Sequence, residues 1–282
     1  HRGYTIVWSG WDSEAPRTGN GMSMQPVIAT DQGKPIVRVI RDELVSGTRN
    51  RADPVAGGAL KREIFRLSYA AATLDQTQAK LTVRRNETDP RREIPAGGWA
   101  YAGETAIELL PAGTRPEPGS LYEFHYPAKE PRVLAVGMAA TRDLIAFLRH
   151  ATTDAKGNAN PAQPGIRAAF AFGISQSGRF LRDFVKDGFN QDESARKVFD
   201  GMLAHTAGAG GVFLNAEFAQ PNRTSTQHED HTMPENEFPF STARMTDPVT
   251  GRAGGLLRND GFDPLWMETN TSTEYWQKGA SL

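Results

Sequence analysis

The second half of the chain alternates short apolar runs with amphipathic runs, which predicts strands and helices in turn. Ala168–Phe172 is short and apolar, as in a strand buried on both faces. Apolar side chains then recur at helical spacing up to Gly188, which is placed as a C-terminal helix cap would be. Ala139–His150 predicts another amphipathic helix, and Val198–Ala204 and Leu265–Thr269 predict further strands. This alternation indicates a mainly parallel sheet with its site at the carboxyl ends of the strands.

The first half has a different pattern. Gly3–Trp11 predicts a buried strand that ends in a Ser-Gly turn. From about residue 24 to residue 120 there is no helical period, and short alternating runs are separated by Gly, Pro and Asp. These runs predict a β-rich insertion and are Ile36–Ile40, Ile64–Tyr69, Lys80–Arg84, Ala106–Leu110 and Leu121–Tyr126.

The patterns divide the chain into three parts. Residues 1–23 are expected to start an α/β core, 24–120 to form the β-rich insertion, and 121–282 to complete the core. The last part carries a long Gly-, Asn- and Pro-rich loop insertion at about 207–258. Four aromatic residues of the β-rich part could line a cleft, but a role in its core is favoured because aromatics at strand spacing usually pack inside. They are Phe65, Tyr69, Trp99 and Tyr101.

A sharp turn joins the strand that ends near Phe172 to the helix that follows. Its small residues Gly173, Ser177 and Gly178 keep bulk away from the turn, and Ser175 stands at its apex. A strand, a tight turn and a helix are the context of a nucleophile elbow, in which strained backbone exposes the serine hydroxyl. The backbone N–H of the next residue, Gln176, then faces a developing oxyanion.

The Gly-x-Ser-x-Ser pattern alone is a weak signal, because a Ser/Gly-rich helix cap has the same composition. Its placement between a buried strand and an amphipathic helix favours Ser175 as a nucleophile. Ser177 is the rival, but it falls inside the first helical turn, where a hydroxyl more naturally caps backbone N–H groups.

Composition removes several classes of function. The 282 residues are 38% hydrophobic with mixed charge, which is typical of a globular protein of one or two domains. A net charge of −1 supplies no basic footprint for nucleic acid, and no apolar run is long enough to span a membrane. The absence of cysteine excludes disulfides, thiolate metal sites and a cysteine nucleophile, while the compartment and the oligomeric state stay open.

Six segments spread over nearly the whole chain also carry a family resemblance. They are Gly3–Trp11, Gly137–Asp143, Gly173–Arg182, Gly188–Asn190, Phe218–Pro221 and Asn270–Trp276. In these segments the chain resembles the α/β-hydrolase superfamily, and most closely a bacterial family of α/β-hydrolase-domain proteins. The resemblance implies an α/β-hydrolase fold with a β-rich insertion. It also implies a serine hydrolase that cleaves a small-molecule carboxylic ester through an acyl-enzyme at Ser175, without a cofactor.

A serine hydroxyl needs a base, and the base needs a carboxylate, which in this superfamily follow the serine in the order acid, then histidine. Glu274 follows Leu265–Thr269 in a Ser/Thr-rich turn, where the superfamily usually places its acid. A capping box between Thr271 and Glu274 fits the same spacing equally well. Asp200 and Asp263 are the second and third choices.

No histidine in the chain stands where the resembled family has its base. His1, His125 and His150 precede the elbow, which is the wrong order. His205 comes at the end of a predicted strand and could contact a site loop or the substrate, although a structural role is favoured. Because the resembled family has earlier strands and a later one, the chain is expected to be truncated at both ends. The base is then expected beyond Leu282, and the second oxyanion donor also outside the chain.

Two other functions stay open. His228 and His231 flank two carboxylates and could hold a divalent ion in a metal-dependent hydrolase, but the spacing matches no standard site and a solvated loop is favoured. A non-catalytic module of the same fold that binds a ligand would also lack the histidine.

Three further residues are candidates for positioning. Asn215 and Gln220 fall in loops that would roof the site, where contacts to substrate are possible and loop-stabilising hydrogen bonds are favoured. Arg182, on the helix behind Ser175, is expected to brace the elbow by pairing with a buried carboxylate.

Overall fold

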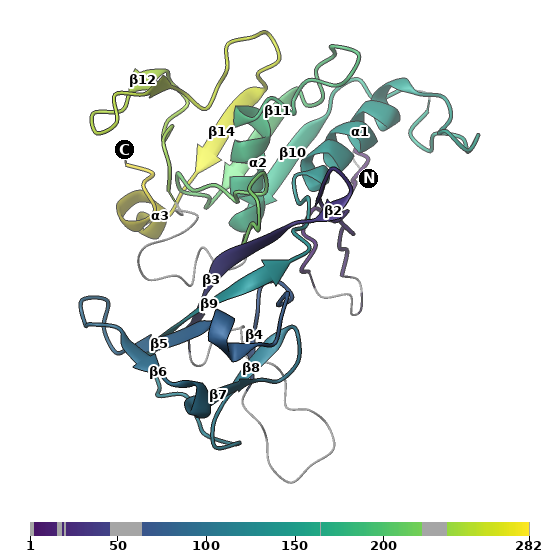
Figure 1. Ribbon diagram of the computed structural model, residues 1–282. Coiled ribbons are helices and arrows are strands. Elements are labelled where there is room, and N and C mark those ends of the chain that lie inside the picture. Colours follow the sequence, from purple (N-terminus) through teal and green to yellow (C-terminus); the bar gives the residue numbers. More distant parts are fainter. Residues whose placement is uncertain are drawn as a thin grey trace. The chain divides into compact units, whose positions relative to one another are not determined.

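The computed structural model describes residues 3–15, 19, 21–45, 64–163, 165–221 and 236–281 (Figure 1). The chain forms two compact units, which are described separately. The α/β unit comprises residues 1–26, 134–214 and 234–282, and the β-rich unit comprises residues 27–133 and 215–233. None of the described helices is long and apolar enough to cross a membrane.

A three-stranded parallel sheet forms the centre of the α/β unit (Figure 1). Its strands, in spatial order, are β10 (Phe170–Ile174), β11 (Gly201–His205) and β14 (Leu265–Thr269). The register aligns Ile174 with His205 and His205 with Thr269, so three carboxyl ends meet at one edge. The alternating pattern therefore predicted a parallel sheet correctly for this unit. It is the one parallel sheet among the five that the described residues form, so a sheet that is mainly parallel across the chain, and with it a complete α/β-hydrolase fold, is not confirmed.

Helices α1 (Val136–His150) and α2 (Gln176–Lys186) belong to the same unit, and α2 packs on β10 and β11. The buried face of α2 carries the side chains that recur at helical spacing in the sequence. Gly188 follows with a φ of 84°, a left-handed conformation that glycine adopts without strain, and the predicted C-terminal end is confirmed. A short helix, α3 (Ser272–Gln277), follows β14. The long loop insertion contains a small hairpin of β12 (Met245–Thr246) and β13 (Ala253–Gly254).

The face of the sheet away from α2 is exposed. Successive side chains of a strand point to opposite faces of the sheet, so alternate residues share one face. On this face Phe170 and Phe172 of β10 are 66% and 62% exposed, and Leu265 and Met267 of β14 are 79% and 61% exposed. The expectation that Ala168–Phe172 is buried on both faces is therefore wrong for one face. The apolar run identifies a strand that can be covered twice, but among the described residues α2 covers only one side.

The segment Gly3–Trp11 is not a strand in the structure, although its sequence predicts a buried one. Residues 3–9 are all exposed, including the large side chains of Tyr4, Ile6 and Trp8, whereas Trp11 at the end of the segment is buried. The segment pairs with no described strand, and without a ladder partner the chain is left in solvent.

The β-rich unit contains two antiparallel sheets. The four-stranded sheet has the order β3 (Val37–Val45), β9 (Leu121–Lys129), β5 (Lys80–Arg84) and β6 (Arg92–Ile94). The three-stranded sheet has the order β4 (Ile64–Arg66), β8 (Ala106–Leu109) and β7 (Trp99–Tyr101). A small hairpin is formed by β1 (Thr30–Asp31) and β2 (Lys34–Pro35). Two single-turn 3₁₀ helices complete the unit, at Gln76–Gln78 and Ala96–Gly98.

All five alternating runs of the sequence fall on strands of this unit, as predicted. Its end differs from the expected boundary at residue 120, because β9 pairs over nine residues with β3 and also with β5. The segment from Leu121 to Val133 therefore belongs to the β-rich unit and not to the core.

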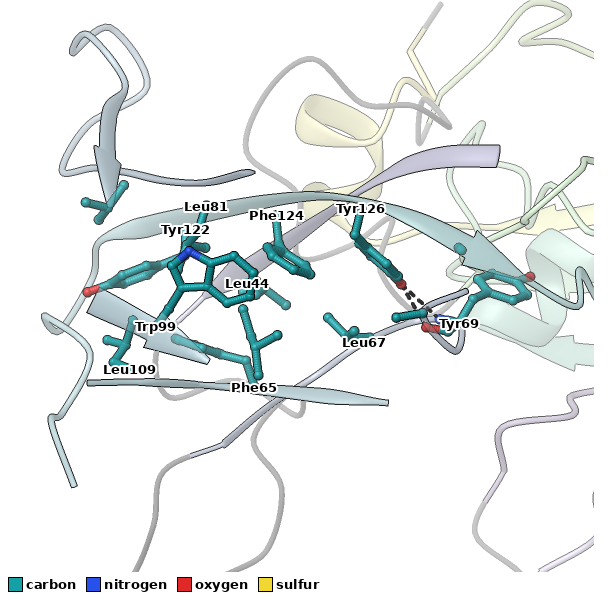
Figure 2. Packing of buried hydrophobic residues seen from close by; sticks show 14 of the residues in the cluster. Leu44, Phe65, Leu67, Tyr69, Leu81, Trp99, Leu109, Tyr122, Phe124 and Tyr126 are labelled. Carbon is teal, nitrogen blue, oxygen red and sulfur yellow. Dashed lines mark hydrogen bonds between the residues drawn. The ribbon is translucent and has the colours of Figure 1, made fainter. Parts of the chain in front are cut away.

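Aromatic side chains fill the space between the two sheets (Figure 2). Trp99 lies with its ring centroid 5.0 Å from that of Phe124, and Phe124 stacks on Tyr126 at 5.0 Å. The Tyr126 hydroxyl donates to the carbonyl of Tyr69 at 2.9 Å. Phe65, Tyr69 and Trp99 are buried, and Tyr101 packs against them, so the prediction of a core role is confirmed for these aromatics.

Asn190 joins three segments of the α/β unit that are remote in sequence. Its buried side chain donates to the carbonyls of Phe199 at 3.0 Å and Phe262 at 2.6 Å, and it accepts from the Phe199 N–H at 2.9 Å. The residue lies in one of the segments that carry the family resemblance, and its role in the structure is to tie the chain before β11 to the chain before β14.

Asn190→Ala should lower the free energy of unfolding by about 2–4 kcal/mol, because it leaves buried backbone groups without partners. Urea denaturation of the purified protein measures the change. Gln163→Ala is the matched control: it removes one exposed amide bond to the Ala151 carbonyl and should cost about 0.5 kcal/mol or less. Equal stabilities of the two variants would contradict the assigned role.

Candidate active site

Ser175 joins β10 to α2 with strained backbone angles. Its φ is 55° and its ψ is −115°, in a region that residues with a Cβ rarely adopt and that costs about 1–3 kcal/mol. The neighbouring strand holds this conformation, because the Ser175 N–H donates to the carbonyl of His205 at 2.8 Å. The Ser175 carbonyl in turn accepts from the N–H of Arg179 in α2 at 3.0 Å. A serine strained in this way between a strand and a helix has the backbone of a nucleophile elbow.

The glycines of the motif are required by the closeness of the two chain segments. A Cβ at Gly173 would lie 2.3 Å from the carbonyl oxygen of Ser177, a distance that no side chain tolerates. A Cβ at Gly178 would lie 3.0 Å from the Cβ of Ala207 and 3.2 Å from the Gly173 carbonyl oxygen. The small residues therefore allow the helix to start directly beside the strand end, as the sequence predicted.

Gln176 is the first residue of α2, and its N–H belongs to the group of four at a helix start that have no acceptor within the helix. The dipole of the helix adds partial positive charge at this end. The sequence analysis predicted that this N–H faces a developing oxyanion, and its position at the helix start suits the binding of an anion next to Ser175.

Ser177, the rival nucleophile, is engaged elsewhere. Its hydroxyl accepts a hydrogen bond from the indole N–H of Trp11 at 3.2 Å, and the Trp11 ring stacks on Phe180 of α2 at 4.8 Å. The sequence contained no indication that these distant residues meet. A buried tryptophan usually finds an acceptor for its N–H, and Ser177 is the acceptor here.

His205 lies at the same sheet edge as Ser175. Its Nδ1 is 2.7 Å from the hydroxyl of Thr269, the last residue of the next strand, and its carbonyl holds the Ser175 N–H. These bonds are those of a residue that ties three strand ends together. Contact of His205 with substrate stays a prediction.

Glu274 lies in the first turn of α3 and forms the capping box that its spacing allowed. The N–H of Thr271 donates to its Oε2 at 2.9 Å, and the Thr271 hydroxyl donates to the same oxygen. The hydroxyl bond, followed by the backbone bond, holds the pKa of Glu274 below its usual range. The carboxylate is therefore ionised at neutral pH, and both of these bonds use Oε2.

The turn that carries Glu274 is fastened to the loop after β11. The Gly208 N–H donates to Asn270 Oδ1 at 3.1 Å, and the Ala209 N–H donates to the Lys278 carbonyl at 2.8 Å. Gly208 has a φ of 62°, and a Cβ there would lie 2.6 Å from the Lys278 Cβ. The two loops that leave the carboxyl ends of β11 and β14 therefore form one connected structure.

Asp200 and Asp263, the other two acids considered, lie at the wrong end of the sheet. Asp200 precedes β11, accepts from the Ala169 N–H at 2.8 Å and pairs with Arg149 at 3.1 Å. Asp263 lies just before β14 and accepts from the N–H groups of residues 258 and 259. A five-residue strand is about 16 Å long, which separates both carboxylates from the edge that carries Ser175. Their candidacy as the acid partner is therefore wrong.

Arg182 braces the elbow helix as predicted. Only 3% of the residue is exposed, and its guanidinium forms an ion pair with Glu268 of β14 and donates to the Phe240 carbonyl at 2.8 Å. Glu268 Oε1 also accepts from the Trp266 indole N–H at 2.9 Å. The sequence left Glu268 unassigned. A carboxylate inside an otherwise apolar strand was the signal that could have identified it as the partner of a buried arginine.

The next residue of α2, Asp183, fixes the loop after β11 from the other side. Its buried carboxylate accepts from the N–H groups of Val212 at 2.7 Å and Phe213 at 3.2 Å, and pairs with Lys186 at 3.0 Å. A Cβ at Gly211 would lie 2.9 Å from the carboxylate oxygen. Helix α2 thus holds the segments that follow β11 as well as β14.

Two predicted site-lining residues, Asn215 and Gln220, belong to the β-rich unit. Asn215 is exposed, whereas Gln220 is buried and donates to the Arg41 carbonyl at 3.2 Å within that unit. For Gln220 this is the loop-stabilising use that the sequence favoured, and contact of either residue with substrate stays a prediction. His228 and His231 lie outside the described residues. Within the described part of the chain, no group of three or more side chains is arranged to hold a metal ion.

A family model described as an alpha/beta hydrolase domain matches residues 58–264, which is well over half of the chain. The matched range includes β10, the turn at Ser175, α2 and β11, and it ends before Glu274. No curated protein and no solved structure matches the chain.

Gly173→Ala should displace the turn at Ser175, because the added Cβ would clash with the backbone carbonyl of Ser177, which cannot rotate away as a side chain can. The expected result is a loss of about 1–3 kcal/mol in the free energy of unfolding, together with slower reaction of Ser175 with a fluorophosphonate. Gly97→Ala, where a Cβ meets nothing within 4 Å, is the matched control. A Gly173→Ala protein that equals the control in both measurements would contradict the packing described for the turn.

Proposed function

Because the chain belongs to the alpha/beta hydrolase domain family, we propose that it is a serine hydrolase that cleaves a carboxylic ester through an acyl-enzyme at Ser175. Membership in the family supports hydrolysis as the reaction class, but a fold hosts many functions and the site must carry the assignment. The observation that carries it is the strained backbone of Ser175 at the junction of β10 and α2. Strain of this size is retained where the surrounding structure enforces it, and such positions cluster at active sites.

In the proposed reaction, Ser175 Oγ attacks the ester carbonyl carbon while a base removes the hydroxyl proton. The carbonyl oxygen becomes an oxyanion, which the Gln176 N–H and the positive end of α2 stabilise. The intermediate collapses, the alcohol leaves with a proton from the protonated base, and the acyl group stays on Ser175. Water, activated by the same base, then releases the carboxylic acid and restores the hydroxyl.

Glu274 is the proposed acid that orients the base and stabilises its protonated form. It follows β14 at the same sheet edge as Ser175, and its lowered pKa keeps it charged at neutral pH. The base in this proposal is a histidine. His205 does not fill the role, because its Nδ1 is bonded to the Thr269 hydroxyl, whereas a triad histidine places Nδ1 on the acid.

A second oxyanion donor has a candidate within the chain, in the segment that ends at Trp11. The indole of Trp11 joins this segment to Ser177 in the first turn of α2. Among the described residues, the backbone N–H groups of Gly10 and Trp11 donate to no protein acceptor. Backbone N–H groups are the usual donors to an oxyanion, and the bond from Trp11 to Ser177 connects these two to the helix that follows Ser175.

The first test of the proposal is covalent labelling of the full-length protein with a fluorophosphonate. Ser175→Ala should abolish labelling, whereas Ser177→Ala loses only the acceptor for Trp11 and should keep most of it. Trypsin releases both serines in the peptide Ala168–Arg179, so fragmentation of that peptide locates the adduct. An adduct on Ser177 would overturn the assignment of the nucleophile.

The second test concerns Glu274. If it orients the base, Glu274→Gln should lower kcat by several orders of magnitude with little change in KM, because the base is held in the wrong tautomer. If it is only a helix cap, the change should cost about 1 kcal/mol of stability and leave turnover intact. Glu193→Gln, which removes an exposed carboxylate near Arg142, is the matched control. Near-normal kcat in a folded Glu274→Gln protein would remove Glu274 from the triad.

A further inference from the structure

The two bonds that Thr271 gives to Glu274 end on one carboxylate oxygen. The backbone N–H and the hydroxyl of Thr271 both donate to Oε2, while the hydroxyl oxygen accepts from the Thr273 N–H at 3.2 Å. The Thr271 hydroxyl therefore caps α3 as an acceptor and holds Glu274 as a donor, while the backbone N–H of Thr271 supplies the second bond to Glu274. Substitutions of the side chain can keep the cap and remove the hydroxyl donor.

The two oxygens of a triad acid likewise have different roles. One oxygen must face the base, and the carboxylate must be fixed so that this oxygen keeps its direction. In the structure both bonds from Thr271 end on Oε2, and neither uses Oε1. A helix cap and a triad acid are thus compatible roles for Glu274, although the sequence presents them as alternatives.

The turn around Thr271 is anchored on both sides, so that a fixed carboxylate is also fixed relative to the sheet edge. Before it, Asn270 accepts from Gly208, and after it the Lys278 carbonyl accepts from Ala209. Both partners lie in the loop that leaves β11 next to His205, whose carbonyl holds Ser175. The turn is therefore bonded to residues 208 and 209, and the backbone of the same loop leads back to His205, which holds Ser175.

We propose that Thr271 is a positioning residue of the triad, which holds Oε2 of Glu274 so that Oε1 is presented to the base. The inference rests on the proposed function of Glu274 as the acid. Thr271 acts through Glu274 and touches neither the substrate nor the reacting atoms. Its hydroxyl is also the main cause of the lowered pKa of Glu274, which agrees with a carboxylate kept charged beside a base.

The experiment compares four variants of the full-length protein with p-nitrophenyl acetate as the substrate. Thr271→Val removes the hydroxyl, and Thr271→Ser restores it as the conservative rescue. Thr271→Asp keeps a strong helix cap but replaces the donor with a charge that repels Glu274. Thr273→Val is the control on the same helix, where the side chain has no hydrogen bond to another described residue.

Thr271→Val should lower kcat about tenfold with KM unchanged, because it removes one hydrogen bond to a charged group. The acidic limb of kcat/KM should also move to lower pH, since a loosely held carboxylate stabilises the protonated base less and lowers the pKa of the base. Thr271→Asp should lose at least as much kcat while its melting temperature stays near that of the parent. Thr271→Ser and Thr273→Val should keep the parent values.

Normal kcat and an unchanged pH profile in Thr271→Asp would overturn the inference, and this result stands even if Thr271→Val fails to fold. Failure of the inference is distinguishable from failure of the proposed function by Glu274→Gln in parallel. If Glu274→Gln is inactive and the Thr271 variants are active, only the role of Thr271 is wrong. If Glu274→Gln is active, the assignment of Glu274 and with it that of Thr271 both fall, while fluorophosphonate labelling still reports on Ser175.

Discussion

The α/β unit depends on the closeness of two backbone segments at the turn between β10 and α2. Gly173 and the Ser177 carbonyl approach so closely that no side chain fits between them, and Ser175 is forced into a left-handed conformation. The conformation is unfavourable by itself and persists because its N–H and carbonyl are both bonded, to β11 and within α2. One short stretch of chain thereby sets the direction of the serine, the start of the helix and the position of the Gln176 N–H.

Helix α2 carries this arrangement to the rest of the unit through polar side chains on its buried side. Arg182 reaches β14, and Asp183 holds the loop after β11 by its N–H groups. Ser177 holds Trp11 from the N-terminal segment. A buried arginine or aspartate is costly to desolvate unless it is well paired, so these contacts specify one arrangement of the segments around the turn. The segments around the candidate site are therefore fixed on a common helix.

The sequence predicted those features that depend on local pattern. The strand Leu265–Thr269, the helix that ends before Gly188 and the glycines around Ser175 follow from periodicity and from turn chemistry, and the structure has them. The predictions that failed depend on which segments pair or pack with one another in the folded chain. The apolar pattern of Gly3–Trp11 shows that a strand could form but not that another strand pairs with it.

The candidate site divides in the same way. Ser175 and Gln176 could be nominated because elbow and helix start are local, whereas Asp200 and Asp263 could be rejected only once the direction of the strands was known. The partnership of Arg182 with Glu268 joins residues 86 positions apart, and the contact of Trp11 with Ser177 joins residues 166 positions apart. Contacts at such separations leave no periodic signal in a single sequence. The capping box of Glu274 was visible as a spacing, but only the structure shows that its two bonds use the same oxygen.

In the proposed mechanism Ser175 becomes covalently acylated during turnover. The most direct test of this step is to quench the full-length protein with acid within milliseconds of mixing with a p-nitrophenyl ester, and to sequence the peptide Ala168–Arg179 by mass spectrometry. We expect the acyl mass on Ser175, together with a burst of nitrophenol close to one equivalent per protein. Turnover with an unmodified peptide, or with the acyl group on Ser177, would contradict the mechanism.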